Sequence, residues 1–558
     1  MRTHMLLLAL FAVAPPLAAQ DPADSAWAGG VYDRARVLYA ARVSADSNDV
    51  VALHRLGLML AWNREYPRAL QLLDRLMVVA PNHAAQVDRA NVLAWSGDYA
   101  RALEAVDQLL TSDPGSVDLW LSKARYLSWS RRFDESLVAY DRLEELVPED
   151  TAVAHAHARV LSWAGRLGEA EDAYRRLLQR DPQDVEALRG LARVASWQGD
   201  LSGGERLWRQ AISAEPDNAE ARLGLSQVLR WQGQARSALA EAEAAARVAP
   251  TDRDTEMQLA WARAAFRPRV APSVVAEFDS EDNRVLTTGL TLGAYLGRRV
   301  ALTAQGYMRR ADDARVGGWS RESLSGSLGL RADVLGGWTV GVSGGVLSRP
   351  DQESVTATAA AAIGSPAWRP VTVSVSASRS VLDVTALLIE NGVRTDEVLL
   401  TVGTKLSPML RLDASGAAAE FRGEERNTRL LGRVGMELRA NRWLSLRPRF
   451  TTFGFDKDVE EGYWDPANYR IAELGLGLDR YRESWGVSAE LAPGAQQIGN
   501  GARWKGAVSV RTRLQYTIAP GRDVGLGFTF SNSGIERHQA EGTAYRYQAA
   551  VLSAGWSF

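Results

Sequence analysis

Tryptophan recurs every 33 or 34 residues through the first half of this chain, and the recurrence then stops. Each repeating tryptophan is followed 19 residues later by a proline, from Pro81 to Pro250. A 34-residue period is typical of stacked helical hairpins, which bury their apolar faces only against their neighbours. The repeating tryptophans are Trp62, Trp95, Trp129, Trp163, Trp197 and Trp231.

Beyond Pro268 the apolar residues recur at every second position instead, to the last residue, Phe558. The run from Val524 to Phe530, for example, alternates large apolar residues with glycine and threonine. A period of two predicts strands. We therefore expect a two-domain α + β chain, with an α-solenoid at residues 21–267 and an antiparallel β-barrel at residues 268–558.

The first twenty residues have the pattern of a secretory signal peptide. A short basic segment (residues 1–4) precedes an apolar run (residues 5–13), and two prolines and small residues follow, up to Gln20. An uncleaved membrane anchor is the alternative, but the apolar run is too short to cross a bilayer. The pattern predicts export, with a signal peptide at residues 1–20.

The composition bounds the chemistry of the chain. Its 65 basic and 67 acidic residues leave a net charge of −2, so no general field recruits nucleic acid, and without cysteine it forms no disulfide. No catalytic, cofactor or metal motif stands out, and we expect a non-enzymatic protein without cofactors. The acidic segments 279–282 and 456–465 could bind calcium or bridge to lipopolysaccharide, but solvated loop charge is the favoured explanation.

The periodic segment resembles the tetratricopeptide repeat. A small residue precedes each tryptophan by five positions, as at Ala124, and another follows by seven, as at Ser136. The resemblance covers about residues 50–252, with capping helices expected at residues 27–48 and 254–266. Position-locked repetition favours a packing role for the tryptophans; the alternative is an aromatic ladder on which sugars stack.

Sixteen alternating runs predict a sixteen-stranded outer-membrane barrel. Weak alternation at residues 355–363 and 382–388 leaves fourteen open. Short connections should alternate with long polar ones at residues 309–320, 380–396, 455–469 and 532–543, as in outer-membrane barrels. Tryptophans stand beside the short turns, and the chain ends on Trp556 and Phe558, which resemble a barrel-assembly signal. The turn tryptophans are Trp338, Trp368, Trp443 and Trp485.

Arginine is frequent on the predicted inner face of the strands. A salt-bridged, water-filled wall is one interpretation, because Asp413, Glu437, Glu473, Asp479 and Glu490 fall on the same face. A cationic path for an anionic solute is the other. The arginines expected in the lumen are Arg411, Arg429, Arg433, Arg439, Arg447, Arg449, Arg511 and Arg513, with Arg331 and Arg349 on the same face.

The order of signal peptide, repeats and terminal barrel resembles the YaiO-type outer-membrane proteins. It is also similar in layout to the export porins for cellulose and poly-N-acetylglucosamine, although this chain has far fewer repeats than the cellulose type. The resemblance implies an outer-membrane location with the repeats in the periplasm. It also implies periplasmic proteins or nascent polysaccharide as partners of the repeats, lipid and lipopolysaccharide around the barrel, and the barrel-assembly machinery as a further partner. We find no sign of a nucleic-acid partner.

Two functions follow from this layout. The first is a channel for exopolysaccharide export or secretion whose repeats dock partners. The second is a non-conducting outer-membrane scaffold whose repeats organise a periplasmic complex.

Overall fold

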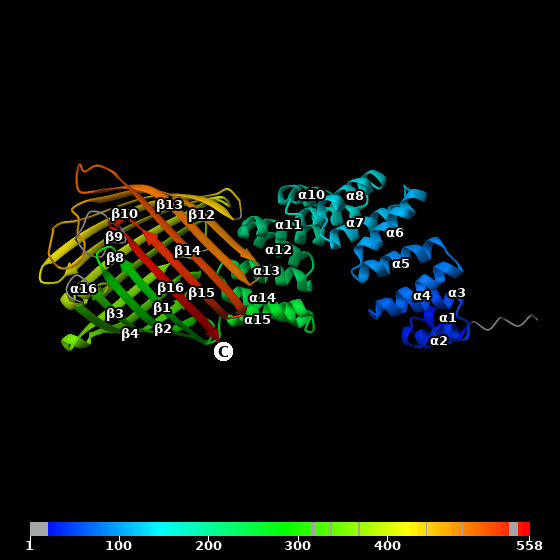
Figure 1. Cartoon of the computed structure of the whole chain (residues 1–558), viewed down its shortest axis with the longest axis horizontal. Coiled ribbons are helices and arrows are strands. Elements are labelled where there is room, and N and C mark those ends of the chain that lie inside the picture. Colours follow the sequence, from blue (N-terminus) through cyan, green and yellow to red (C-terminus); the bar gives the residue numbers. More distant parts are fainter. Residues whose placement is uncertain are drawn as a thin grey trace, which may run out of the picture. The chain divides into compact units, whose positions relative to one another are not determined.

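Helical hairpins build the first part of the chain (Figure 1). The computed structural model describes residues 21–313, 319–334, 337–366, 369–441, 443–482, 484–534 and 545–558, so the predicted signal peptide lies outside the described residues. The chain divides into two compact units, one ending at Pro182 and the other running from Gln183 to Phe558. The helices of the first unit are α1 (Pro22–Ala28), α2 (Tyr32–Ala45), α3 (Val50–Trp62), α4 (Tyr66–Val79), α5 (His83–Trp95), α6 (Tyr99–Ser112), α7 (Val117–Trp129), α8 (Phe133–Leu146), α9 (Thr151–Trp163) and α10 (Leu167–Arg180).

Local sequence sets both ends of the first helix in each hairpin. A capping side chain accepts a hydrogen bond from the backbone three residues on, as Asp150 does from the Val153 N–H at 3.0 Å. The helix ends at its tryptophan, and the chain turns through a left-handed residue two positions later. Glycine occupies that position in two of these hairpins, Gly97 (φ 89°) and Gly165 (φ 79°), because it adopts positive φ without steric cost.

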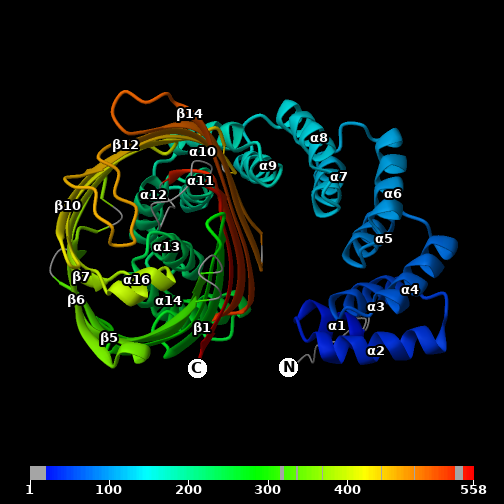
Figure 2. The same ribbon diagram turned by 60° about the vertical axis from the view of Figure 1, so that its left-hand side comes forward.

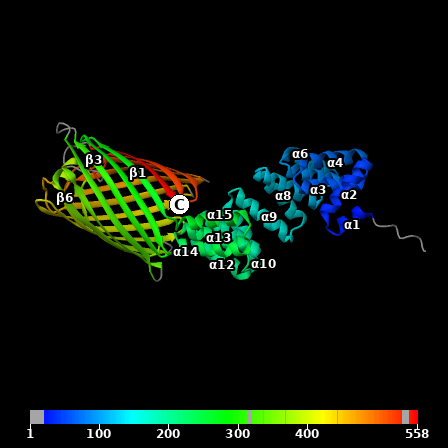
Figure 3. The ribbon, with the colours of Figure 1, turned by 90° about the horizontal axis from the view of Figure 1, so that it is seen from below.

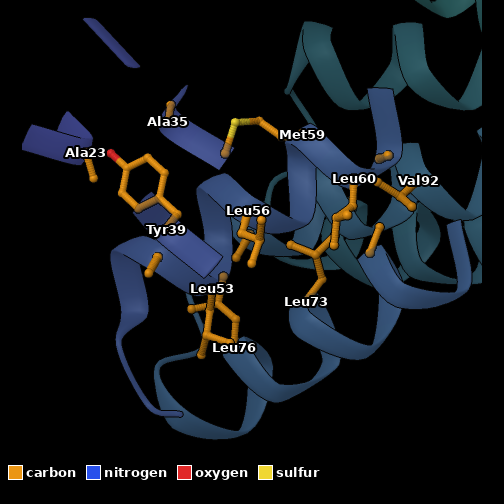
Figure 4. Close-up of a cluster of buried hydrophobic side chains, with 14 of the residues drawn as sticks. Ala23, Ala35, Tyr39, Leu53, Leu56, Met59, Leu60, Leu73, Leu76 and Val92 are labelled. Carbon is orange, nitrogen blue, oxygen red and sulfur yellow. The ribbon is translucent and has the colours of Figure 1, made fainter. Parts of the chain in front are cut away.

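Small side chains allow the two helices of a hairpin to approach closely. Ala90, Ala124 and Ala158 are fully buried. At Ala124 the contact extends to the backbone, because the Ser136 hydroxyl on α8 donates to the Ala124 carbonyl at 2.7 Å. Figure 4 shows the larger side chains that pack within and between the first hairpins, including Leu56 and Leu73.

We expect Ala124→Leu to destabilise the repeats by about 1–3 kcal/mol, because the added carbons would force α7 and α8 apart. Thermal unfolding followed by circular dichroism measures the effect. Ala152→Leu is the matched control, because Ala152 is exposed on α9. Equal stability of the two variants would contradict the close packing at Ala124.

The second unit begins with five further helices and continues as a sheet. The helices are α11 (Val185–Gln198), α12 (Leu201–Ala214), α13 (Ala219–Trp231), α14 (Ala235–Val248) and α15 (Arg253–Ala264). The helical part of the chain therefore extends from Pro22 to Ala264, and it includes helix α1 before the first expected cap. No helix among the described residues is both long and apolar enough to span a bilayer.

Sixteen antiparallel strands close into a barrel (Figures 1 and 3), which confirms sixteen rather than fourteen. Each strand pairs with its sequence neighbours, and β1 pairs with β16, for example Val274 with Leu552. The strands are β1 (Arg269–Asp279), β2 (Asn283–Leu296), β3 (Val300–Asp313), β4 (Trp319–Asp333), β5 (Thr339–Arg349), β6 (Ser354–Gly364), β7 (Val371–Val381), β8 (Arg394–Ser407), β9 (Leu410–Arg422), β10 (Arg426–Arg439), β11 (Leu444–Phe455), β12 (Tyr469–Arg482), β13 (Trp485–Ile498), β14 (Lys505–Ala519), β15 (Arg522–Ser531) and β16 (Tyr547–Ser557).

Alternation gives the barrel an apolar outer face and a polar inner one. On β12, for example, Leu474, Leu476 and Leu478 are exposed, while Glu473 and Asp479 lie on the opposite face. An apolar outer band around a polar interior is the pattern of outer-membrane barrels.

One expectation about the connections is wrong. The predicted long loop at residues 309–320 is largely strand, because β3 and β4 remain paired as far as Asp313 with Trp319. Polar side chains there do not interrupt the sheet, since the strand ladder is made by backbone groups. Residues 382–388, whose weak alternation left the strand count open, lie within the predicted 380–396 connection, as a loop and the start of the short helix α16 (Ala386–Asn391).

The other connections follow the predicted lengths where they are described. The chain is non-stranded between Phe455 and Tyr469, and β14 turns directly into β15 at Pro520 and Gly521. Trp443 and Trp485 are exposed beside their turns, and Trp338 is half-buried. Trp368 and most of the 532–543 connection lie outside the described residues.

Candidate functional site

Arginines and carboxylates on the inner face of β10–β14 form one connected set of ion pairs, here called the wall network. At its centre, Arg449 on β11 binds Glu473 on β12 (Nε to oxygen 2.7 Å) and Glu490 on β13 (2.6 Å). The Ser509 hydroxyl on β14 also donates to Glu473, at 3.1 Å. Glu473 is 4% exposed in its side chain, so it depends on these partners.

Arg447 extends the wall network toward the short-turn end of the barrel. It binds Glu490 at 3.2 Å and Glu437 at 3.3 Å, and it also pairs with Asp479. Arg439 and Arg511 complete the set through Glu437 (3.4 Å) and Glu490 (3.5 Å).

The wall network is electrically balanced. It joins four arginines, at positions 439, 447, 449 and 511, to four carboxylates, at positions 437, 473, 479 and 490. Each guanidinium therefore has an opposite charge within contact distance, and the network presents paired charges rather than a cationic surface.

The remaining predicted lumen arginines lie apart from the wall network. Arg429 pairs with Glu397 at 2.7 Å and lies over the Phe421 ring, and the Arg433 Nε donates to the Thr451 hydroxyl at 3.1 Å. Arg411 and Arg513 are exposed at their positions on β9 and β14.

The wall at β5–β7 has a different composition. Its inner positions alternate with the exposed Val342, Val355 and Val375, and apart from Leu347 and Arg349 at the loop end of β5 they carry small uncharged side chains. This wall offers hydroxyl groups and little charge. The inner residues are Ser343, Thr356, Thr358, Ser374, Ser376 and Ser378.

The connection between β7 and β8 folds into the barrel, and Figure 2 shows α16 inside the ring of strands. We call residues 382–393 the inward segment. Asp383 fixes its start: the carboxylate accepts hydrogen bonds from the Tyr307 hydroxyl (3.0 Å) and the Ser323 hydroxyl (2.8 Å), and it pairs with Arg309.

Cationic and amide groups hold the other end of α16. The Arg349 guanidinium donates to the carbonyls of Ile389 (3.2 Å) and Glu390 (2.9 Å), and Gln352 donates to the latter at 2.7 Å. A cation at the C-terminal carbonyls of a helix is favoured by the helix dipole. The Glu390 side chain itself pairs with Arg321.

The inward segment packs on two sides of the barrel. Ala386 and Ile389 are buried with Val285 and Ala311 of β2 and β3. Leu388 belongs instead to an apolar cluster on β9, β11, β12, β14 and the β11–β12 connection. That cluster contains Val393, Ala419, Phe421, Phe453, Phe455, Val459, Tyr463, Tyr469, Ile471 and Ala507. The inward segment therefore bridges the lumen between these two apolar clusters.

The connection between β11 and β12 supports the inward segment from the other side. Its Glu461 carbonyl accepts a hydrogen bond from the Asn391 side chain at 2.8 Å. Buried Asp465 organises this loop, accepting from the Val459 N–H at 2.8 Å and from the Asn427 amide at 3.3 Å. Residues 456–468 and the inward segment thus form one assembly within the loop end of the barrel.

Burial raises the pKa of the Asp465 carboxyl to about 6, and the neighbouring Asp458 adds to the rise. The folded loop therefore binds a proton more tightly than the released loop, whose aspartate titrates near 3.8. The stability that this group contributes is greatest at low pH and is lost as pH rises through about 6.

We expect the Val459 amide to lose protection from hydrogen exchange by about tenfold between pH 5 and pH 8, after correction for the intrinsic rate. Asp465→Asn keeps an oxygen acceptor but does not titrate, so its protection should not change with pH. A pH-independent wild-type protection factor would contradict this account.

Helices α11–α15 contact the short-turn end of the barrel. Glu243 on α14 binds Arg298 in the β2–β3 turn at 2.8 Å, and Arg236 binds Asp333 at the end of β4 at 3.4 Å. The Lys405 ammonium at the end of β8 donates to the Gly199 carbonyl at 3.2 Å. These contacts are distributed around the rim, so the last repeats lie at the opening opposite the inward segment.

The repeating tryptophans are half-exposed. Trp62, Trp95, Trp129, Trp163 and Trp231 have 40–48% of their surface accessible, and Trp197 is partly buried. Each is the last or nearly the last residue of its helix, so each occupies the same edge of its hairpin.

The terminal aromatics lie where β16 closes the barrel. Trp556 is exposed on the outer face with Arg522 above its ring (4.2 Å), and the Phe558 N–H donates to the Pro268 carbonyl at 3.0 Å. Their part in barrel assembly stays a prediction.

Sequence reasoning missed the inward segment. Local signals for a helix were present, because Thr385 caps it (Leu388 N to Thr385 Oγ1, 3.2 Å) and Gly392 ends it at φ 62°. No local signal indicates that the segment turns inward. Within the described residues, no group of histidine, aspartate and glutamate has the arrangement of a metal site.

Two tetratricopeptide-repeat models match the chain, over residues 93–160 and 152–194. None of the curated proteins matches it. Among solved structures it is similar to a bacterial polysaccharide outer membrane secretin (11% identity, TM-score 0.43, covering 52% of this chain and 98% of that one). It is also similar to a tetratricopeptide repeat protein from Parabacteroides merdae (14%, 0.38, 42% and 94%) and to yeast Tom70 (15%, 0.37, 46% and 58%).

The class of protein is defined by the two architectures together. Tetratricopeptide repeats precede a closed sixteen-stranded barrel in one chain. This is the layout of the repeat-plus-barrel export porins.

We expect Arg449→Leu to destabilise the barrel by about 3 kcal/mol, because Glu473 and Glu490 would lose their principal partner in a buried setting. Urea unfolding in detergent, followed by the heat-modifiable migration of the folded barrel, measures the change. Arg513→Leu is the matched control on β14, because its side chain is exposed. Adding Glu473→Gln to Arg449→Leu should recover part of the loss, and its failure to do so would contradict charge pairing as the cause.

Proposed function

We propose that this protein is an outer-membrane channel for exopolysaccharide export or secretion, with its repeats in the periplasm. The observation that carries the proposal is the inward segment. It crosses a closed, polar-lined barrel and is held there by side-chain contacts that can be exchanged without disturbing the strand ladder.

The lining of the barrel suits an uncharged, hydroxyl-rich chain. Paired charges on β10–β14 offer both donors and acceptors, and the β5–β7 wall offers serine and threonine hydroxyls. The wall network itself has no net charge of the kind by which pores select ions, although Arg433 and Arg513 lie outside it on the same wall.

The proposed orientation rests on the asymmetry of the connections. Short turns of outer-membrane barrels lie on the periplasmic side. The last repeats contact the short-turn end here, through Arg298 and Lys405. The predicted signal peptide at residues 1–20 supports export, and Trp556 and Phe558 would present the chain to the assembly machinery.

The repeats would bind the periplasmic partners. Helical solenoids of this kind expose an extended surface that binds other proteins or polymers. We propose that synthase components or the nascent polymer bind there, while lipid and lipopolysaccharide surround the barrel.

A non-conducting scaffold is the second candidate. The packing of Leu388 and Ile389 on different parts of the barrel favours it, because a bridge with apolar contacts on both sides obstructs passage. The two candidates differ in whether the bridge ever leaves the lumen.

Replacing residues 383–392 by a turn of about four Gly and Ser residues should convert a closed barrel into a conducting one. The hairpin can accept a short turn, because the Leu382 N–H already donates to the Val393 carbonyl at 2.8 Å. Single-channel recording in planar bilayers measures the change. Asp383→Ala, which removes the acceptor of three side-chain donors, should give brief openings of the same kind.

Arg379→Gln is the matched control. Arg379 pairs with Asp396 on the exposed side of the same hairpin, so its loss should leave the conductance unchanged. Absence of conductance in the shortened barrel would overturn the channel and favour the scaffold.

A further inference from the structure

A chemical module recurs with each tryptophan of the first unit. Three and six residues after the indole, the turn carries an arginine and a carboxylate that bind each other. The pairs are Glu65–Arg68 (2.7 Å), Asp98–Arg101 (3.5 Å), Arg132–Glu135 (2.6 Å) and Arg166–Glu169, which follow Trp62, Trp95, Trp129 and Trp163.

The order of the two charges reverses along the solenoid, but their sum does not change. The acid comes first in two modules and the arginine first in the other two. Each module therefore combines one half-exposed indole with a donor and an acceptor whose charges cancel. Trp197 is partly buried and is followed at these positions by Asp200 and Gly203, so the module is confined to the first unit.

Packing alone does not account for these features. A tryptophan that only filled the gap between hairpins would be buried, as Trp208 is at 3% exposure, whereas the four indoles keep 40–48% of their surface accessible. Exposed aromatic surface bordered by polar groups is typical of interaction sites. Modules of the same composition in successive repeats also fit a ligand that is itself periodic, and at Trp62, where Trp27 stacks on one face at 5.6 Å, the ligand would use the other face.

We propose that these four modules form a ladder of subsites for a linear, uncharged hexopyranose polymer. The flat apolar face of a pyranose ring packs on an indole, while the guanidinium of the same module donates hydrogen bonds to the ring hydroxyls and the carboxylate accepts hydrogen bonds from them. Such a module has no net positive charge to attract a polyanion. This ligand class specifies the polymer that the proposed channel would export, and its role in the cell rests on that proposed function.

Repetition of the subsites also predicts how affinity depends on ligand length. A single subsite holds one ring weakly, while a chain that reaches two or more subsites gains from their linkage. Affinity should therefore rise steeply once the oligosaccharide is long enough to span neighbouring repeats.

The test measures binding of cello- and chito-oligosaccharides, from two to eight units, to the full-length protein in detergent by isothermal titration calorimetry. We expect the octamer to bind at least tenfold more tightly than the dimer. Trp95→Leu with Trp129→Leu should weaken octamer binding at least tenfold, because leucine keeps apolar volume but lacks a flat face. Trp95→Phe with Trp129→Phe should retain most of it.

Val78→Ala with Val138→Ala is the control, because both valines are exposed on second helices of the same solenoid. Circular dichroism shows whether each variant is folded, and Arg132→Gln with Glu135→Gln tests the polar half of one folded module without touching an indole. Equal affinity of the leucine and phenylalanine variants, no length dependence, or binding only of a peptide or polyanion would overturn the ladder. Conductance of the shortened barrel is measured separately, so the ladder and the channel can fail independently.

Discussion

Closure of the sheet by β1 and β16 is the constraint on which the rest of the barrel depends. Hydrocarbon offers no partner to backbone N–H and C=O groups, so a sheet that crosses it must have no free edge. Pairing from Arg269 with Ser557 to Asp279 with Tyr547 provides this closure. It also encloses the inner face, so polar side chains there meet one another or whatever enters the lumen.

Enclosure explains why the inner face carries such dense ion pairing. Arg449 and Glu473 lie on adjacent strands, and neither can turn to the outer side, where apolar residues such as Phe450 and Leu474 alternate with them. Unpaired, each would be a costly partly buried charge. The same enclosure allows the inward segment to be held by side chains from several strands. Tyr307, Ser323 and Arg309 reach Asp383 from two strands, and the resulting contacts are local, polar and separable from the ladder.

The sequence predicted the elements whose patterns are long and regular. The tryptophan period located the hairpins, and alternation of large and small residues, as in β15, located strands. It failed where the determining contacts are distant. Asp383 is held by residues 60 to 76 positions earlier, which periodicity cannot show. The short apolar run from Leu382 to Leu388 fits helix and strand equally, and tertiary partners decide between them. Polar side chains at residues 309–320 suggest a loop, so the sequence underestimates the length of β3 and β4. The strand ladder continues through Asp312 and Asp313.

Ion pairs without net charge occur both in the indole modules and in the wall network, and they bear on how a polymer could move through such a protein. Passage requires subsites that are weak and similar, because one strong site would hold the chain in place. The four indole modules of the first unit and the paired charges of the barrel wall meet this condition in the same way, by presenting donors and acceptors without net charge. When one sugar ring leaves a module, the next ring of the polymer can then take its place with little change in free energy. The inward segment is different, because the polar groups that a polymer could bind there already bind Asp383. Control of export would therefore lie in competition for those partners rather than in the affinity of the repeats.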